Sequence, residues 1–156
     1  MDIIIETPKG SNIKYKYNKD HQLFKLHKTL PAGLSFPHDF GFFPNTKGED
    51  GDPIDVMLLS EFKTFPGCLI DGRIIGCIQA EQSSGNKMIS NHRFLAVPEQ
   101  SVVFENAISI EDIPSTLVTE IESFLTTYMQ LEGKKIKLPG NLNAAKAMEL
   151  FNQLKA

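Results

Sequence analysis

The sequence predicts an α+β domain in which a small β-barrel is followed by two helices. The first 110 residues read as short apolar strands separated by turn residues, and the last third changes to helical spacing. The chain has 156 residues, enough for one domain with a sizeable core, and no repeat, low-complexity tract or linker divides it. We therefore expect a single domain over residues 1–156.

Six segments have the composition of β-strands. Turn-forming stretches such as Pro8-Lys9-Gly10 separate the first ones, and residues 56–59 are apolar on both faces, as expected for a strand of a closed barrel or covered sheet. Asp71-Gly72 is compatible with a hairpin turn or with a continuous strand. The expected strands are residues 3–6, 12–17, 22–28, 56–59, 68–78 and 93–97.

Two helices are expected near the C-terminus. Pro114 suits a first helical position, apolar residues then recur at helical spacing from Leu117 to Leu131, and Gly133 can end the helix. A second helix follows Asn141 and carries one apolar face.

Composition excludes several classes of protein. The formal net charge of -3 argues against general affinity for nucleic acid or anionic membranes. We expect no signal peptide, and no window approaches the roughly 18 apolar residues of a membrane span. Cys68 and Cys77 lie in apolar stretches, which favours a buried, reduced pair over a disulfide or redox site. These features predict a cytoplasmic protein.

The stretch GEDGDPIDVMLLSE, residues 48–61, brings three carboxylates close together. An acidic surface turn would explain Asp50 and Asp52, but Asp55 directly precedes an apolar strand and is expected to be partly buried. Carboxylates near an apolar wall need a cation, and the stretch itself contains no basic residue. The pattern therefore favours a divalent metal with oxygen ligands, magnesium or calcium before zinc.

Two other interpretations of this stretch are rejected. Asp50, Asp52 and Glu61 match three positions of a calcium-binding EF-hand loop, but Asp55 occupies the position that needs glycine. A bare D-x-D pattern, as found in sugar-nucleotide enzymes, is too short to support that function.

The run Asp50-Gly51-Asp52-Pro53-Ile54-Asp55-Val56 resembles the D-x-D-P-x-D-x signature of the soluble (family I) inorganic pyrophosphatases. The segments FPHDFGFFP (residues 36–44) and FLAVP (residues 94–98), and Tyr128 before Gly133, also resemble family segments and keep their order. The similarity covers nearly the whole chain and identifies it as a divergent member.

The resemblance implies a closed, five-stranded OB-like barrel with the two helices packed outside. It also implies magnesium-dependent hydrolysis of pyrophosphate to two phosphates, and a homo-oligomer, commonly a hexamer in bacterial members. Metal ions bridging water and phosphate would neutralise a compact polyanion and lower the pKa of the water. Carried over by position, Asp50 and Asp55 ligate magnesium, Asp52 contacts the metal and deprotonates the attacking water, Glu6 lines the metal pocket, and Lys14 and Tyr128 hold phosphate oxygens.

Several positions depart from the family pattern. Lys16 stands where a Glu is expected, Lys28 replaces a phosphate-binding Arg, Phe40 replaces a Tyr, and Met129 replaces a phosphate-binding Lys. In the longer loop after residue 81, counting back from residues 94–98 puts Asn91 at a metal-ligand position and Arg93 at a phosphate-binding Lys position. Counting forward puts Glu81 or Gln82 at a further acid position.

These changes differ in their expected effect. Lys28 and Arg93 keep a positive charge, and Asn91 can still coordinate a metal through an uncharged oxygen. We therefore expect metal binding at fewer or weaker sites and a weakened phosphate clamp. The alternatives are a related phosphoanhydride or phosphoester hydrolase with an altered substrate, or a catalytically weakened homologue that binds metal or phosphate. An oligonucleotide-binding OB module would need a basic, aromatic groove that the sequence lacks.

Overall fold

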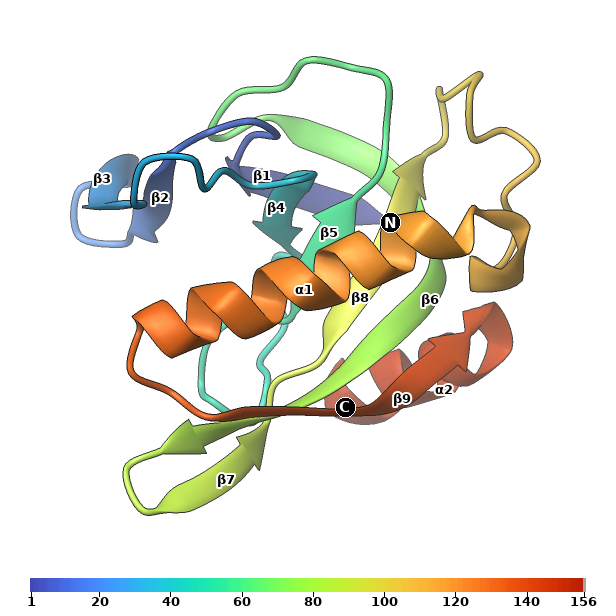
Figure 1. The fold of residues 1–156 in the computed structure, drawn as a ribbon. Helices are drawn as coiled ribbons and strands as arrows, with labels where there is room; N and C mark the ends of the chain where they lie inside the picture. The colour runs from blue at the N-terminus through green and yellow to red at the C-terminus, as the bar shows by residue number, and fades with distance from the viewer. Residues whose placement is uncertain (156) are drawn as a thin grey trace.

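The computed structural model describes residues 1–155 as a strand-rich fold with two α-helices (Figure 1). Its helices are η1 (Ile110–Asp112), α1 (Ser115–Leu131) and α2 (Ala144–Lys155). Its strands are β1 (Asp2–Thr7), β2 (Ile13–Asn18), β3 (Leu23–Thr29), β4 (Asp39–Phe42), β5 (Asp55–Leu58), β6 (Leu69–Ser84), β7 (Lys87–Ser90), β8 (Arg93–Pro98) and β9 (Ile136–Asn143).

Five of these strands pair in a closed ring. β1 pairs with β4, β4 with β5, β5 with β8, β8 with β6, and β6 pairs back with β1. All of these pairings are antiparallel except that of β5 with β8. The predicted α+β fold with a closed five-stranded barrel and two outside helices is confirmed.

The structure adds three strands that the sequence did not reveal and moves two outside the barrel. β2 and β3 pair only with each other in a separate hairpin. β4 and β7 have four residues each, too short for a clear alternating pattern. β9 contains Pro139 and Gly140, residue types that are depleted in strands; it pairs only with β6 and so lies at a sheet edge, where proline is tolerated. The open question at Asp71-Gly72 is answered by the continuous strand β6.

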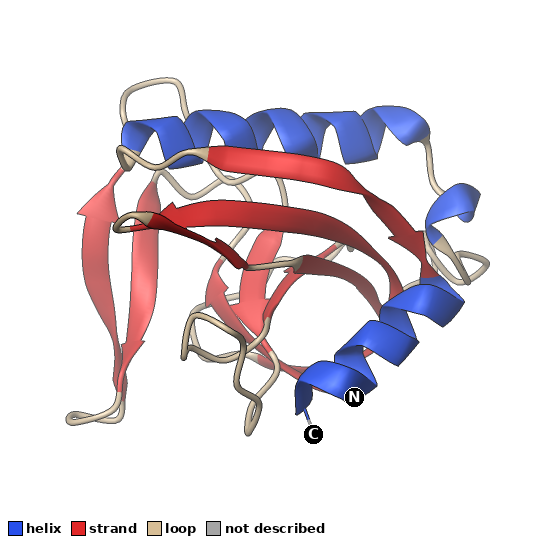
Figure 2. Cartoon of the chain, turned by 90° about the horizontal axis from the view of Figure 1, so that it is seen from below, coloured by secondary structure: helices blue, strands red, loops and turns tan. Residues whose placement is uncertain are grey.

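Two apolar clusters explain why β5 is apolar on both faces. Val56 and Leu58 belong to a cluster with Phe151 of α2, whereas Met57 belongs to a cluster with Phe124 of α1. Successive side chains of a strand point to opposite faces, so each face of β5 meets a different partner. Helix α1 lies across one side of the barrel and α2 packs at another (Figures 1 and 2).

Helix α1 ends where predicted and begins one residue later than predicted, with Pro114 before its first turn; its C-terminal end places its last turn. Its first residue, Ser115, follows Pro114, and Gly133 has a φ of 72°, the left-handed conformation common after a helix end. The C-terminal end of α1 lies on the same side of the molecule as the β2–β3 hairpin (Figures 1 and 2). A side chain at this end can therefore meet one from the hairpin.

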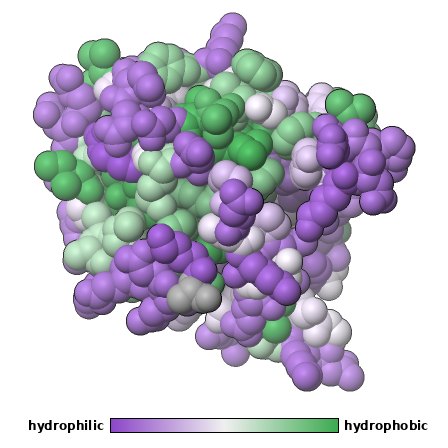
Figure 3. Space-filling model, turned by 180° about the vertical axis from the view of Figure 1, so that it is seen from behind, coloured by the Kyte–Doolittle hydropathy of each residue, from purple (hydrophilic) through white to green (hydrophobic). Residues whose placement is uncertain are grey.

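The cysteines and the surface also bear on the sequence predictions. Both cysteines are free, as predicted; Cys77 is buried as expected, but Cys68, directly before β6, is only half-buried. Within residues 1–155, the helices are too short or too polar to cross a membrane. Large apolar side chains stay exposed, among them Phe65 and Leu69, and Figure 3 shows apolar groups gathered on the face behind α1.

The loop that leads into α1 is anchored by Glu61. The Ser101 hydroxyl donates a hydrogen bond to one oxygen of the Glu61 carboxylate at 2.7 Å, and the backbone N–H groups of Val102 and Val103 donate to the other at 2.9 and 3.0 Å. These hydrogen bonds favour the charged form and lower the pKa of Glu61 to about 2.

We expect Glu61→Gln to weaken the pH dependence of stability in acid. A depressed carboxyl pKa contributes stability above the unfolded pKa of about 4.3, and this contribution is lost as the pH falls towards about 2. Urea unfolding at several pH values should therefore show a smaller decline between pH 4.5 and 2 for the variant. Glu105→Gln, which removes a carboxylate from the same loop, is the control. Equal declines for Glu61→Gln and the parent would contradict this role.

Candidate active site

A cleft of about 420 Å³ lies between the β2–β3 hairpin, the end of the barrel and the end of α1. It brings together residues that are distant in the sequence. All nine predicted site residues line it: Glu6, Lys14, Lys28, Asp50, Asp52, Asp55, Asn91, Arg93 and Tyr128.

The three signature aspartates form one side of the cleft. Asp50 and Asp52 lie in the loop before β5, and Asp55 is its first residue. The backbone N–H of Asp52 donates to the Asp50 carboxylate at 3.1 Å, while the Asp52 side chain stays exposed. Partial burial raises the pKa of Asp50, and the neighbouring Asp52 charge adds to this rise. Both features indicate a site that would accept positive charge.

Asp55 faces a buried cation. The Arg93 Nε lies 3.5 Å from the Asp55 carboxylate, and the Arg93 side chain is only 3% exposed. The Arg93 guanidinium also donates to the Gln82 side-chain oxygen at 3.3 Å and to the Asn91 backbone carbonyl. Its Nε has no hydrogen-bond partner among residues 1–155, so one buried donor remains available on the side of Asp55.

The oxygen donors suit a hard divalent cation, but they are not gathered into a compact set. In the described part of the chain, no three Asp, Glu, His or Cys side chains are close enough to hold a metal ion together. Asp55 is instead balanced by Arg93, with Lys14 nearby. The chemistry of the residues therefore fits a metal, whereas side-chain movement or further ligands would be needed to complete its coordination.

Glu6 and Lys14 connect the barrel to the hairpin. Glu6 accepts a hydrogen bond from the backbone N–H of Tyr17 at 3.2 Å, and burial raises its pKa despite the nearby Lys14 charge. The Lys14 ammonium lies 4.9 Å from the ring centre of Phe40 and 5.4 Å from that of Tyr128. Burial lowers the pKa of Lys14, while Glu6 and Asp55 oppose this shift. The aromatic pair thus forms a floor under one cation of the cleft.

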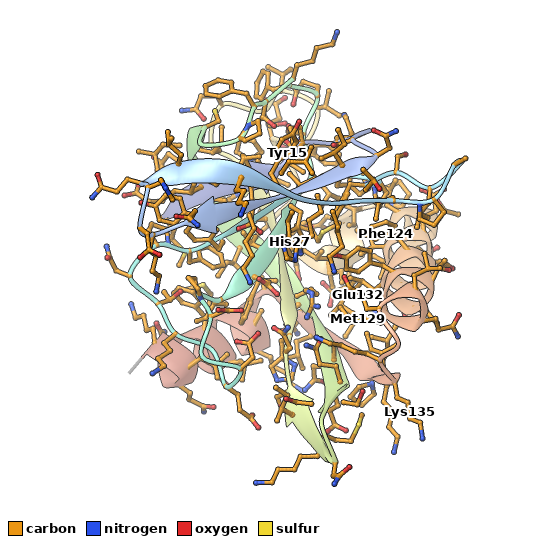
Figure 4. All side chains as sticks on the ribbon, turned by 90° about the vertical axis from the view of Figure 1, so that its left-hand side faces the viewer. Tyr15, His27, Phe124, Met129, Glu132 and Lys135 are labelled. Carbon is orange, nitrogen blue, oxygen red and sulfur yellow. The ribbon has the colours of Figure 1, made fainter. Side chains whose placement is uncertain are left out.

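Sequence analysis missed an anion that contacts two predicted site residues. The Lys28 ammonium donates to both carboxylate oxygens of Glu132 at 2.5 Å, although 104 positions separate the residues. Burial raises the pKa of Tyr128, and a hydrogen bond with Glu132 raises it further. Figure 4 shows Glu132 and Met129 at the end of α1, on the side facing His27 of the hairpin. Glu132 follows Tyr128 by four residues, so helical spacing could have placed them on one face.

The segment after residue 81 folds as a hairpin of β6 and β7. Glu81 pairs with Ser90 across this hairpin and does not line the cleft, whereas Gln82 does and is 5% exposed. Asn91 lines the cleft beside Arg93. Of the two positions considered for the further acid, the one facing the site is therefore an uncharged amide, because strand alternation turns Glu81 away.

Comparisons with known proteins agree with these observations. A family model described as inorganic pyrophosphatase matches residues 3–156. A relative named inorganic pyrophosphatase from Methanosarcina acetivorans is 34% identical, covering 99% of this chain and 89% of the relative. One of the same name from Halalkalibacterium halodurans is 33% identical, covering 98% and 91%. The crystal structure of inorganic pyrophosphatase from Thermus thermophilus matches with a TM-score of 0.91 at 30% identity, covering 99% of this chain and 88% of that one.

We expect the Arg93–Asp55 contact to be strongly coupled. Arg93→Met leaves a largely buried carboxylate without its cation and should destabilise the fold by about 3–5 kcal/mol in the absence of divalent cations. Adding Asp55→Asn to this variant should recover part of the loss, because the unpaired charge is removed. Urea unfolding of the two single variants and the double variant measures the coupling. Strictly additive effects would show that the two side chains do not compensate each other.

Proposed function

The chain belongs to the inorganic pyrophosphatase family and hydrolyses pyrophosphate to two phosphates, and we propose that the cleft described above carries out this reaction with magnesium as the metal. The observation that carries the proposal is the meeting of Asp50, Asp52 and Asp55 with Lys14, Lys28 and Arg93 in one cleft. Carboxylates can hold divalent cations, and the basic groups can hold phosphate oxygens. We further propose that residues 1–156 act as a single pyrophosphatase-like domain.

The proposed magnesium ligands are Asp50, Asp52, Asp55, Glu6 and Asn91. Bound magnesium supplies charge neutralisation and lowers the pKa of the attacking water. Asn91 contributes an uncharged oxygen, so magnesium binding is weaker here than with a carboxylate in that place. Gln82, beside Arg93, is uncharged, so this side of the cleft has less negative charge than it would have with an acid at that position.

The remaining steps belong to side chains of the chain itself. Asp52 is exposed to water in the cleft, and it orients the attacking water and takes its proton. Water attacks one phosphorus, the bond to the bridging oxygen breaks, and its electron pair leaves with the second phosphate. Arg93, Lys14 and Lys28 balance charge on the phosphate oxygens, and the Tyr128 hydroxyl donates a hydrogen bond.

Lys28 must share its charge between Glu132 and phosphate. Its contact with Glu132 is half-buried, so pyrophosphate has to compete with this carboxylate for the ammonium group. Met129 and Phe40 add no polar group to the cleft, which makes the remaining cations more important for holding substrate.

The homo-oligomer, with the hexameric form as its model, and the cytoplasmic location remain predictions from the sequence. Exposed apolar side chains such as Phe65 and Leu69, each 62% exposed, support an association surface.

We expect Asp52→Asn to keep the fold and lose most of the activity. Removing a positioned base typically lowers the rate about 10²–10⁴-fold. Phosphate release from pyrophosphate, measured with and without magnesium, should show this loss, and circular dichroism should show an intact fold. Asp2→Asn, which removes an exposed carboxylate from β1, should retain the parent rate. Parent-like turnover by Asp52→Asn would refute the role of Asp52.

Magnesium should stabilise the protein without substrate. Binding relieves repulsion among the aspartates, and a ligand at about 100 times its Kd adds roughly 2.7 kcal/mol of stability. Thermal unfolding of the parent protein at increasing magnesium should show a rising Tm. The Tm of the Asp50→Asn/Asp55→Asn double variant should respond little to magnesium. Asn91→Asp restores a carboxylate and should reach the half-maximal shift at lower magnesium. A parent Tm that does not respond to magnesium would remove the proposed metal site.

A further inference from the structure

The β2–β3 hairpin concentrates positive charge. Lys14 lies directly opposite Lys28 in the pairing of the two strands, and Lys16 lies directly opposite Lys25. Like charges in directly opposed cross-strand positions destabilise a strand pair. Two lysine pairs, separated only by the Tyr15–Leu26 pair, therefore suggest that the charge of the hairpin serves an anionic ligand.

The lysines of the hairpin differ in whether they have partners within the protein: Lys14 and Lys28 have them, whereas Lys16 and Lys19 are in no ion pair among residues 1–155. Lys28 contacts Glu132, and Lys14 lies over two aromatic rings near Glu6. Lys16 and Lys19 line the same cleft, and within residues 1–155 neither takes part in an ion pair. The cleft therefore continues from the proposed pyrophosphate site towards two unpaired cations.

The side chains that line the cleft carry more positive than negative charge, which favours an anionic ligand. Its lining contains six cationic side chains against five carboxylates, in a chain whose net charge is -3. The cations are Lys14, Lys16, Lys19, Lys28, Lys134 and Arg93. Burial lowers the pKa of His27, and the charges of Lys28, Lys16 and Lys14 lower it further, which shows that these lysines act on a common region.

The geometry also provides room beyond the reacting phosphates. Residues two apart on a strand are separated by roughly 7 Å, so Lys16 extends the row of cations outward from Lys14. A cleft of about 420 Å³ is within the range that accommodates ligands considerably larger than two phosphate groups. Lys19, beyond the end of β2, continues the row towards solvent.

We propose that Lys16 and Lys19 form an outer phosphate subsite and that the chain binds and hydrolyses linear inorganic polyphosphates of three or more phosphates. This proposal rests on the proposed function, since the terminal phosphates occupy the pyrophosphate site. Water attacks the terminal phosphorus and gives its proton to Asp52. The bond to the bridging oxygen breaks, and the electron pair leaves with the shortened chain. Tripolyphosphate thus yields one phosphate and one pyrophosphate.

Binding is tested with inorganic tripolyphosphate and pyrophosphate on the Asp52→Asn variant, which prevents turnover. At a fixed free magnesium concentration, calorimetry should show about tenfold tighter binding of tripolyphosphate, equivalent to about 1.4 kcal/mol. Adding Lys16→Gln and Lys19→Gln should abolish this preference. Adding Lys63→Gln and Lys146→Gln, which remove two exposed charges outside the cleft, should preserve it. Equal affinities, or a preference that survives the loss of Lys16 and Lys19, would overturn the outer subsite.

Hydrolysis is tested on the parent protein with the same two compounds. We expect phosphate release from both, and a fall of about tenfold in kcat/KM for tripolyphosphate relative to that for pyrophosphate in Lys16→Gln/Lys19→Gln. Release from pyrophosphate alone would overturn this inference while leaving the proposed function intact. Release from neither compound would overturn the proposed function itself.

Discussion

The backbone pairing of β6 is the interaction on which the rest of the structure depends. This strand hydrogen-bonds with β1 and β8 within the barrel, and with β7 and β9 outside it. At Gly76 a Cβ atom would approach the Leu142 carbonyl oxygen to 2.9 Å, so glycine permits the close contact with β9. This one strand thus closes the barrel and also pairs with the two strands outside it, β7 and β9. Its residue Gln82 reaches Arg93.

Compensation of buried charge organises the cleft. Asp55 is placed against the apolar strand β5 and is balanced by Arg93, which reaches it from the start of β8. These strands are parallel neighbours, so the ion contact depends directly on their pairing. Lys28 and Glu132 make a second contact of this kind between the hairpin and α1. The protein therefore balances within itself charges that metal ions and phosphate groups can also balance.

The two halves of the cleft differ in how they are supported. The aspartates are attached to the barrel, whose strands pair on both sides. The lysines lie on a hairpin that forms no backbone ladder with the barrel. The Lys28–Glu132 contact helps to orient this hairpin. The Phe24 ring also packs beside Gly67, where an added Cβ atom would lie only 3.2 Å from it. The metal side is thus held by main-chain hydrogen bonds, and the phosphate side largely by side chains.

The sequence by itself determined the class of fold, the helix bearing Tyr128 and the acidic run at one side of the cleft, and the family resemblance added further residues that line it. Local patterns suffice for these features, because helical spacing, strand alternation and the DGDPID run each depend on neighbouring residues. Tertiary structure alone decided that β2 and β3 lie outside the barrel, that Gln82 and not Glu81 faces the cleft, and that Glu132 contacts Lys28. Strand register and the packing of the hairpin and α1 against the barrel set these contacts. They join residues as many as 104 positions apart, a relation that no local pattern records.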